Sequence, residues 1–435
     1  MSDIDEIVAL TKRRGFVFPS SEIYGGVGGF WDYGPLGVEL ANNIKALWWK
    51  AIVYDRDDVV GLDAAIIMNP KVWEASGHVD SFTDPLVECK VCHERFRADQ
   101  PDEIEVHEKY HRGRGVKDVA WTQPRQFNLL FRTFIGPVED NSAPAYLRGE
   151  TCQGMYVNFP NVVATSRVRV PFGIAQIGKA FRNEVTPGKF LFRLREFDQM
   201  ELEFFVHPKE GEKWFAYWKE ERMRWMLSLG LQKAHLRFRQ HETSERAHYA
   251  ADSWDIEYDF PEWGFKDLEG IANRTDYDLK THSKCSGKDL SYTDPITKET
   301  FVPYIIEPSV GVSRLFLALL TDAYHEEEKR VVLRLAPSLA PVKVAVFPLV
   351  ANKPDLVDKA RGIYTNLKKS FAVSWDDRGN IGKSYISQDE IGTPWCVTVD
   401  YDTLESDTVT VRDRDTTKQE RVKVDSLASF FQEKL

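Results

Sequence analysis

The chain has 435 residues, a formal net charge of −10 at pH 7, 43% hydrophobic residues and 29% charged residues. This composition is typical of globular proteins, and no apolar run approaches the roughly 20 residues of a membrane-spanning helix. The negative charge argues against nonspecific coating of nucleic acid, although a local basic surface could still bind RNA. Five thinly spread cysteines predict no disulfide framework, and the acidic start is unlike a signal peptide. We therefore expect a cytoplasmic protein of two to four domains.

The first clear pattern is a helical stripe near the N-terminus. Its apolar positions, spaced three and four apart, are Leu36, Leu40, Ile44 and Leu47 with Trp48. An apolar run at residues 64–68 follows, and we interpret it as a strand that ends at Asn69 and Pro70. The segment from about 81 to 143 is polar, charged and weakly periodic, which indicates an insertion between core elements.

Two cysteines and two histidines in this insertion have zinc-finger-like spacing, Cys89-x2-Cys92-x14-His107-x3-His111. The two histidines, with a glutamate after the first, also match the pattern of zinc proteases. No third protease ligand is recognisable, so we reject that alternative. A solvated helix in a charged insertion is the simpler interpretation, and we treat structural zinc as the less favoured one.

The segment from 180 to 206 carries most of the chemistry. After a turn at 186–189, residues 190–206 alternate between apolar even positions and polar odd positions, which predicts one long strand. The polar positions are Arg193, Arg195, Gln199, Glu201 and Glu203, and Arg182 and Glu184 point the same way on the partner strand. Because arginine offers a planar fork of donors to phosphate oxygens, we interpret this face as a floor for a phosphate ester. A solvated sheet surface is the alternative.

A second polar group occupies residues 304–314. The first part is a predicted strand with Glu307 and Ser309 on one side, and Pro308, which cannot donate to a ladder, predicts a free edge. A helix begins just after this strand with Arg314 in its first turn, an arrangement that favours an anion. An ordinary capped core helix is the alternative for this segment taken alone.

A Pro/Ala linker at residues 335–341 divides the chain. Beyond it, strands and helices alternate over about 95 residues, which predicts a small α/β domain. The predicted elements are a strand at 342–347, a helix with the stripe Leu356, Ala360, Ile363 and Leu367, strands at 395–399 and 408–411, and a helix at 424–434.

Together these segments resemble the class II aminoacyl-tRNA synthetases. Residues 181–184 and 193–197 resemble motif 2, residues 307–314 resemble motif 3, and the helix at 36–48 with the run ending at Pro70 resembles motif 1, a dimer element. Within the class, the runs similar to the dimeric glycyl-tRNA synthetase family are 31–37, 69–78, 148–154 and 269–279, and residues 389–394 resemble the anticodon-binding domain.

The resemblance implies an α+β chain, with an antiparallel-sheet catalytic domain over 1–335 and an α/β anticodon-binding domain over 341–435. It implies a ligase that uses ATP with Mg²⁺ to convert glycine into glycyl-adenylate and pyrophosphate. The glycine is then transferred to the 3′ end of tRNA(Gly) in translation. A cytoplasmic homodimer without a membrane partner is expected.

The resemblance also assigns roles to residues of this sequence. The expected catalytic residues are Arg182, Glu184 and Arg314. The expected ATP-binding residues are Arg182, Asn183, Glu184, Phe192, Arg193, Leu194, Arg195, Glu196, Phe197, Leu268, Glu269, Gly311, Val312, Ser313 and Arg314. The expected glycine-binding residues are Arg97, Glu150, Phe197, Gln199, Glu201, Glu307, Ser309 and Gly311. Glu269 is also a candidate Mg²⁺ ligand, and the candidate anticodon contacts, for which a plain surface role is equally open, are Trp375, Arg378, Arg412 and Arg414.

Two other functions stay open at this point. A non-catalytic relative, similar to the accessory subunit of the mitochondrial DNA polymerase, would keep the fold but lose charged motif residues. The retained residues that argue against it are Arg182, Glu184, Arg193, Glu307 and Arg314. A class II synthetase for another amino acid is disfavoured by the three pocket carboxylates and the glycyl-type runs.

Overall fold

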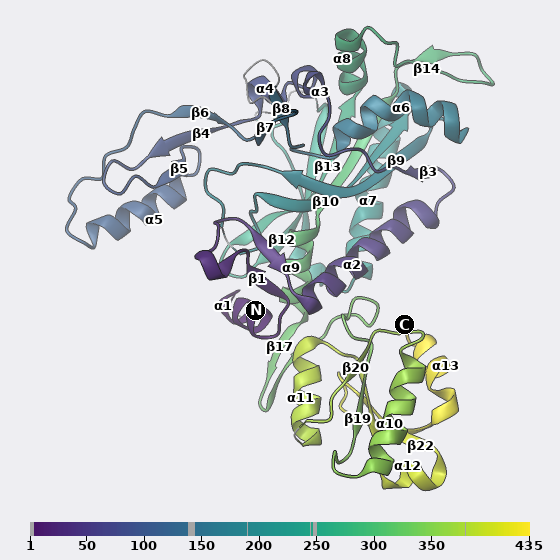
Figure 1. Cartoon of the computed structure of the whole chain (residues 1–435). Helices are drawn as coiled ribbons and strands as arrows, with labels where there is room; N and C mark the ends of the chain where they lie inside the picture. The colour runs from purple at the N-terminus through teal and green to yellow at the C-terminus, as the bar shows by residue number, and fades with distance from the viewer. Residues whose placement is uncertain (1–3, 138–143, 189, 244, 247–249, 379) are drawn as a thin grey trace.

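The computed structural model describes residues 4–137, 144–188, 190–243, 245–246, 250–378 and 380–435. A seven-stranded sheet forms the centre of the N-terminal part (Figure 1), and all its strand pairs are antiparallel except β3 with β9. In spatial order the strands are β11 (Leu236–Gln240), β12 (Asp252–Phe260), β13 (Gly264–Thr275), β16 (Tyr304–Gly311), β10 (Glu196–Val206), β9 (Phe172–Phe181) and β3 (Val59–Gly61). The expected antiparallel catalytic sheet is confirmed.

Helices cover both faces of this sheet. The main core joins one face to α2 (Pro35–Trp49), α7 (Gly211–Ser228) and α9 (Val312–Ala323). A smaller core joins the other face to α6 (Cys152–Ser166) and α8 (Tyr277–Ser286). Since side chains alternate along β10, Met200 and Leu202 enter the main core, while Glu201 and Glu203 point to the α6 side.

Short elements surround the sheet. The two-stranded ribbons are β1 (Val17–Pro19) with β2 (Trp31–Tyr33), β7 (Arg132–Phe134) with β8 (Pro144–Tyr146), β14 (Tyr292–Thr293) with β15 (Thr300–Phe301), and β17 (Tyr324–Glu327) with β18 (Arg330–Leu333). The short helices are α1 (Ile4–Arg13), α3 (Pro70–Ala75) and α4 (His78–Ser81). No helix among the described residues is both long and apolar enough to cross a membrane.

The predicted strand over 190–206 is too long. β10 begins at Glu196, and the preceding residues form a turn that is closed by a bridge between Gly188 and Arg193. The backbone of Arg182 donates to the carbonyl of Arg195 over 2.9 Å, so the chain folds back beside the end of β9. Residue 189 of the predicted turn lies outside the described residues.

Two further strand predictions are wrong. Residues 64–68 form no strand, because Ile66 and Ile67 are exposed and only Ile67 makes an isolated bridge, to Leu147. β16 is not a free edge either, since it lies between β13 and β10. Glu307 and Pro308 of β16 are not paired with β10, although the residues on both sides of them are. The proline therefore interrupts the hydrogen bonds between two central strands locally.

The C-terminal part is a five-stranded mixed sheet between helices, which confirms the predicted α/β fold. Its strands, in spatial order, are β20 (Val373–Trp375), β19 (Val344–Pro348), β21 (Trp395–Val399), β22 (Thr408–Asp413) and β23 (Gln419–Lys423). The apolar stripe of α10 (Pro354–Leu367) is buried on one face together with α13 (Leu427–Gln432), and α11 (Ile381–Ile391) covers the other. The short helix α12 (Tyr401–Ser406) precedes β22.

The predicted linker is packed rather than free. Leu339 and Ala340 are fully buried, and Asn43 of α2 donates to both of their carbonyls. The Nζ of Lys343 donates to three linker carbonyls over 2.7–2.9 Å. The linker therefore belongs to the core of the N-terminal part.

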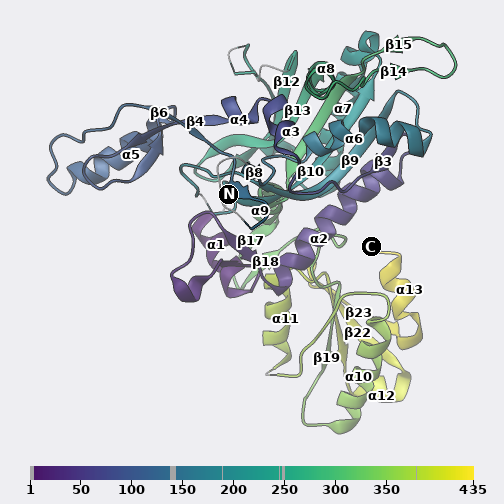
Figure 2. The ribbon, with the colours of Figure 1, turned by 45° about the horizontal axis from the view of Figure 1, so that its top comes forward.

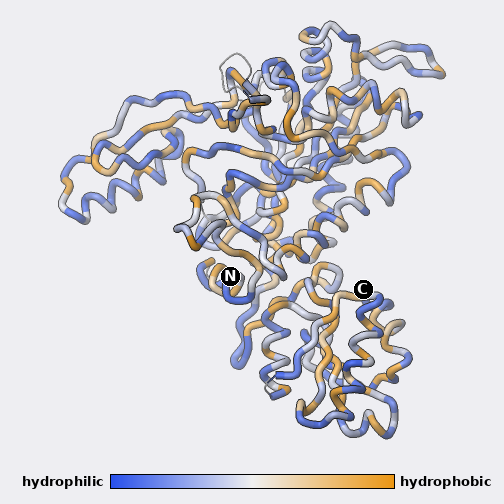
Figure 3. The backbone as a smooth tube through the Cα atoms, viewed as in Figure 1, coloured by the Kyte–Doolittle hydropathy of each residue, from blue (hydrophilic) through white to orange (hydrophobic). Residues whose placement is uncertain are grey.

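The insertion projects from the body as a separate small unit (Figures 1 and 2). It holds a three-stranded antiparallel sheet of β5 (Arg95–Arg97), β4 (Thr83–Glu88) and β6 (Arg125–Asn128), and the helix α5 (Pro101–Arg112). Figure 3 shows α5 as largely hydrophilic and the C-terminal sheet as rich in hydrophobic residues. The end of the predicted insertion, residues 138–143, lies outside the described residues.

Candidate active site

A cavity of about 240 Å³ opens where β10, β13, β16 and the start of α9 meet. The expected ATP-binding residues that line it are Arg182, Glu184, Phe192, Arg193, Leu194, Phe197, Leu268, Gly311, Ser313 and Arg314. The expected glycine-binding residues that line it are Phe197, Gln199, Ser309 and Gly311. The structure thus brings the three expected catalytic residues to one cavity.

Two guanidinium groups are held at this cavity by backbone carbonyls and aromatic rings. The Nε of Arg182 donates to the carbonyl of Gly149 over 3.0 Å, and its guanidinium lies 5.5 Å from the ring centre of Phe197. The Nε of Arg314 donates to the carbonyl of Phe192 over 2.9 Å, and its guanidinium lies 4.3 Å from that ring. Two fixed arginine forks beside one cavity are suited to a polyanion such as a triphosphate.

Asp267 is a cavity residue that sequence reasoning missed. Its carboxylate forms an ion pair with Arg314, and its carbonyl accepts from the same guanidinium over 3.1 Å. No sequence motif includes Asp267, because its contact with Arg314 depends on how β13 and the start of α9 are placed in the folded chain. An anion that binds Arg314 must compete with this carboxylate or share a cation with it.

The other expected ATP-binding residues do not line the cavity, and they are Asn183, Arg195, Glu196, Glu269 and Val312. Arg195 donates to the carbonyls of Glu184 and Gly28 over 2.9 and 2.8 Å, so it fixes the turn before β10. Val312 is buried in the main core, and Glu196 pairs with Lys179 over 3.3 Å.

Glu269 lies on the wrong face of the sheet for its expected role. It is paired opposite Val310, whose side chain is in the main core, and it accepts from the Nε of Arg222 on α7 over 2.5 Å. Ser309, one residue further along β16, faces the cavity instead. The expectation that Glu269 binds ATP or Mg²⁺ is therefore corrected, because the side chain is used in a buried ion pair.

A compact set of buried carboxylates adjoins the cavity. Glu201 accepts from Ser309 over 2.7 Å and from Gln199 over 2.9 Å, which links it to the cavity wall. Glu307 accepts from Arg274 over 2.9 Å, and Glu150 lies 3.3 Å from His78. Thr151 also donates to Glu201 through its backbone and its hydroxyl. The three expected pocket glutamates are thus gathered, each with a different partner.

The pKa values of these carboxyl groups diverge. Burial raises the pKa of Glu307 to about 8, in spite of the nearby charge of Arg274. Burial likewise raises the pKa of Glu201, and the negative charge of Glu150 adds to the effect. Burial alone would raise the pKa of Glu150, but the charge and hydrogen bond of His78 lower it well below the ordinary value. Such a pocket favours a small cation that can compensate the buried negative charge.

The guanidinium of Arg97 pairs with Asp84 over 2.9 Å and with Asp99 over 2.7 Å. The hydrogen bond of Asp99 raises the pKa of Arg97, and the charge of the cavity residue Glu184 adds to the effect, so Arg97 lies near the cavity. Its role in binding glycine stays a prediction. Besides Asp267, sequence reasoning missed His78, Thr151 and Arg274. All three belong to the runs that suggested the family, but nothing in the sequence pairs them with the pocket glutamates.

Comparisons with known proteins agree with this geometry. Residues 132–324 match the family model described as the tRNA synthetase class II core domain (G, H, P, S and T), and residues 343–434 match an anticodon binding domain. Over 99% of its length, the chain is 53% identical to the glycine–tRNA ligase of Thermobifida fusca (strain YX) and spans 98% of that protein. It is 53% identical to the one from Streptomyces coelicolor and 52% identical to the one from Caldanaerobacter subterraneus, with the same coverage.

The chain belongs to the glycine–tRNA ligase family. Arg412 and Arg414 were candidate anticodon contacts or plain surface residues, but both are buried and donate to acidic side chains, and Arg414 also donates to a backbone carbonyl. Neither alternative holds for these two residues. Arg378 is exposed and stays a prediction. Trp375 packs against the core of this part, with Arg361 stacked 3.7 Å from its ring centre.

Proposed function

We propose that this chain joins glycine to tRNA(Gly) at the expense of ATP. One observation carries the proposal: Arg182 and Arg314 converge on a cavity whose wall continues into buried carboxylates, among them Glu201 and Glu307. Arginine forks suit a triphosphate, and the carboxylates suit the ammonium group of an amino acid without a side chain. The non-catalytic alternative would require these charges to be missing or dispersed.

In the first step, a carboxylate oxygen of glycine attacks the α-phosphorus of ATP, and the bond to the leaving pyrophosphate breaks. Because the nucleophile is already ionised, no general base is needed, and positioning with charge stabilisation provides most of the rate. Arg182 contacts the α-phosphate and the attacking carboxylate, and Arg314 holds the distal phosphates. Phe197 stacks on adenine.

The cavity also fits a Mg²⁺ ion bound with the phosphates. Mg²⁺ usually takes one or two carboxylates together with phosphate oxygens and waters, and Glu184 and Asp267 are carboxylates that line the cavity. The ion would neutralise charge on the phosphates. Asp267, rather than Glu269, is thus the favoured ligand on β13.

Glycine selection rests on exclusion. Glu201, Thr151 and Gln199 are buried where the amino acid is proposed to bind, so we expect a methyl group added to glycine to overpack this end of the cavity. The glycine ammonium is held by Glu150, Glu201, Glu307 and the hydroxyl of Ser309. In the second step, the terminal ribose of the tRNA attacks the glycyl carbonyl, and AMP leaves.

We also propose that the enzyme acts in the cytoplasm as a homodimer through the surface around α2. The proposal rests on the resemblance of α2 to motif 1, and large apolar side chains are exposed on α2 (Val38) and on the segment before it (Phe18, Ile23 and Tyr24). The molar mass from light scattering tests this part of the proposal, and a monomer at micromolar concentration contradicts it.

Amino-acid-dependent exchange of pyrophosphate into ATP tests the activity. We expect exchange with glycine and little with alanine or serine, because their larger side chains would have to enter the space among the buried side chains around Glu201. Equal exchange with alanine or serine contradicts the glycine specificity. No exchange with any amino acid favours the non-catalytic alternative.

A further inference from the structure

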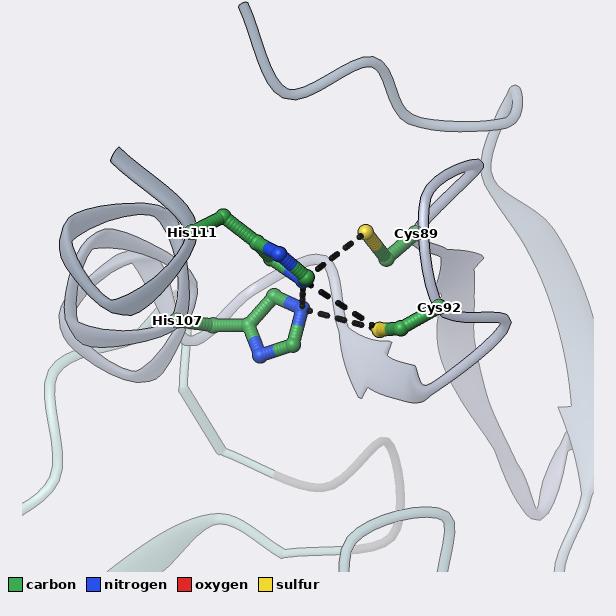
Figure 4. Close-up of side chains that lie close together, drawn as sticks. All are labelled: Cys89, Cys92, His107 and His111. Carbon is green, nitrogen blue, oxygen red and sulfur yellow. Dashed lines mark hydrogen bonds between the residues drawn. The ribbon is translucent and has the colours of Figure 1, made fainter. Parts of the chain in front are cut away.

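The insertion brings together two cysteines and two histidines that the proposed reaction does not use (Figure 4). The Sγ of Cys92 lies 3.4 Å from the Nε2 of His107 and 3.3 Å from the Nε2 of His111. The Sγ of Cys89 lies 3.8 Å from the Nε2 of His111, and the two Nε2 atoms are 3.1 Å apart. All four potential ligand atoms lie within 4.8 Å of one another.

Local structure explains why the four side chains converge. Cys89 directly follows β4, and Cys92 lies in the tight turn to β5, where the backbone of His93 donates to the carbonyl of Cys89 over 2.9 Å. His107 and His111 are four residues apart on α5, so they lie on one face of the helix. That face is turned toward the hairpin.

The expectation of a solvated helix face is wrong here. His107 is only 8% exposed and His111 only 7%, and Cys89 is fully buried. Two imidazoles and the thiol of Cys89 are thus buried around one point, and a nitrogen of each ring faces the cysteine sulfurs (Figure 4). The side-chain geometry thus reverses the preference for a solvated helix that the charged sequence of the insertion suggested.

The distances fit a tetrahedral metal site. Around a Zn²⁺ ion with bonds of roughly 2.3 Å to sulfur and 2.0–2.1 Å to nitrogen, a regular tetrahedron has edges of about 3.3 Å between nitrogens and about 3.6 Å between sulfur and nitrogen. The corresponding separations here are 3.1 Å and 3.3–3.8 Å. The Nδ1 of His107 lies 3.3 Å from a carboxylate oxygen of Glu94, as expected when a carboxylate orients a zinc-bound imidazole.

We propose that Cys89, Cys92, His107 and His111 bind one structural Zn²⁺ ion. Four protein ligands leave no open position, so the ion stabilises the insertion and takes no part in catalysis. Between residues 83 and 128 of the insertion, the buried hydrophobic residues are Leu86, Val87 and Cys89, and small units with so little apolar core commonly depend on a metal. The ion joins α5 to the β4–β5 hairpin.

Metal content of the full-length chain tests the proposal. The protein is produced with added zinc, and unbound metal is removed by gel filtration. The zinc content per chain is then measured by inductively coupled plasma mass spectrometry. We expect about one zinc per chain, and a content near zero in Cys92→Ser and in His107→Ala. Cys285→Ser, which changes an exposed cysteine on α8, is the matched control and should retain the metal.

A cobalt titration tests the same site in the wild-type chain, so its result does not depend on whether a variant folds. After removal of zinc by a chelator, Co²⁺ added to the wild-type chain should give the thiolate charge-transfer and d–d absorption of a tetrahedral site. Addition of Zn²⁺ should abolish both. A wild-type chain that holds no zinc and gives no such spectrum overturns the proposal, as does equal zinc content in the wild type and both ligand variants.

Discussion

At the scale of single residues, burial gives chemically identical side chains different properties. Glu150 and Glu307 are both buried beside the cavity, yet the pKa of Glu150 is well below its ordinary value and that of Glu307 is raised to about 8. The difference follows from the neighbouring charges. His78 lies beside Glu150 and lowers its pKa. Glu307 has Arg274 beside it, but the negative charges of Glu201 and Glu150 also act on it and add to the effect of burial. One carboxyl group of the pocket is therefore ready to gain or lose a proton near neutral pH.

The apparent KM for glycine should depend on pH through Glu307. Below pH 8 this group is mostly protonated, and above it the carboxylate can pair with the glycine ammonium, so KM should fall as pH rises from about 6.5 to about 8.5. Pyrophosphate exchange at saturating ATP measures this. Glu307→Gln should have a high KM that barely changes over the same range. A flat profile in the wild type contradicts the role of Glu307.

Arg182→Ala should reduce glycine-dependent exchange by roughly 100-fold or more, because a fixed positive charge at the reacting phosphate is lost. The circular dichroism spectrum should remain that of the wild type, since the guanidinium lies at a cavity wall. Arg237→Ala, at an exposed position on β11, is the control and should retain activity. Near-normal exchange in Arg182→Ala removes this residue from its proposed role.

At the scale of elements, strand register decides which carboxylates reach the cavity. Period-two alternation in the sequence correctly predicts that Glu201 and Glu203 share a face, because alternation is a local property of a strand. Between Asp267 and Glu269, however, the pairing of β13 with β12 shifts at a β-bulge, so these two residues do not share a face although they are two apart. Nothing in the sequence marks this bulge, and the family resemblance therefore assigns Glu269 to the site and misses Asp267. The strand wrongly predicted at 64–68 has an apolar composition but no partner strand.

Glu269 and Asp267 should respond differently to removal of their charge. Glu269→Gln leaves Arg222 buried without its counter-charge and should lower the free energy of unfolding by on the order of 3–5 kcal/mol. Asp267→Asn should leave stability nearly unchanged, since that side chain is half exposed, and should raise the Mg²⁺ concentration needed for exchange. Urea unfolding and Mg²⁺ titrations measure the two effects. If Glu269→Gln alone shifts the Mg²⁺ requirement, the original expectation is restored.

At the scale of the whole molecule, the two parts are joined by a buried ion network. Asp389 of α11 is fully buried and accepts from both terminal nitrogens of Arg412 over 2.8–2.9 Å. It also accepts from Arg330 of β18, in the N-terminal part, over 2.8 Å. Composition and element order predicted both folds, but the network could not be predicted, and Arg412 was expected at the surface.

Asp389→Asn should leave the buried Arg412 without its counter-charge, and leave Arg330 with Glu327 alone, so the free energy of unfolding should fall by roughly 3 kcal/mol. Because the network spans both parts, charging of tRNA should decrease more than pyrophosphate exchange, which needs only the N-terminal cavity. Urea unfolding and the two activity assays measure this. Asp415→Asn, at an exposed partner of Arg414, is the control, and equal loss in both assays contradicts the proposed separation.

The packed segment at 335–341 has a consequence for the nucleic acid. Since Asn43 and Lys343 secure its carbonyls, the C-terminal part is not tethered loosely, and its separation from the cavity is set before any tRNA arrives. A tRNA whose acceptor end and anticodon are spaced differently cannot reach both sites at once. Given the proposed function, we expect this fixed separation to favour tRNAs of matching dimensions, independent of which bases are read.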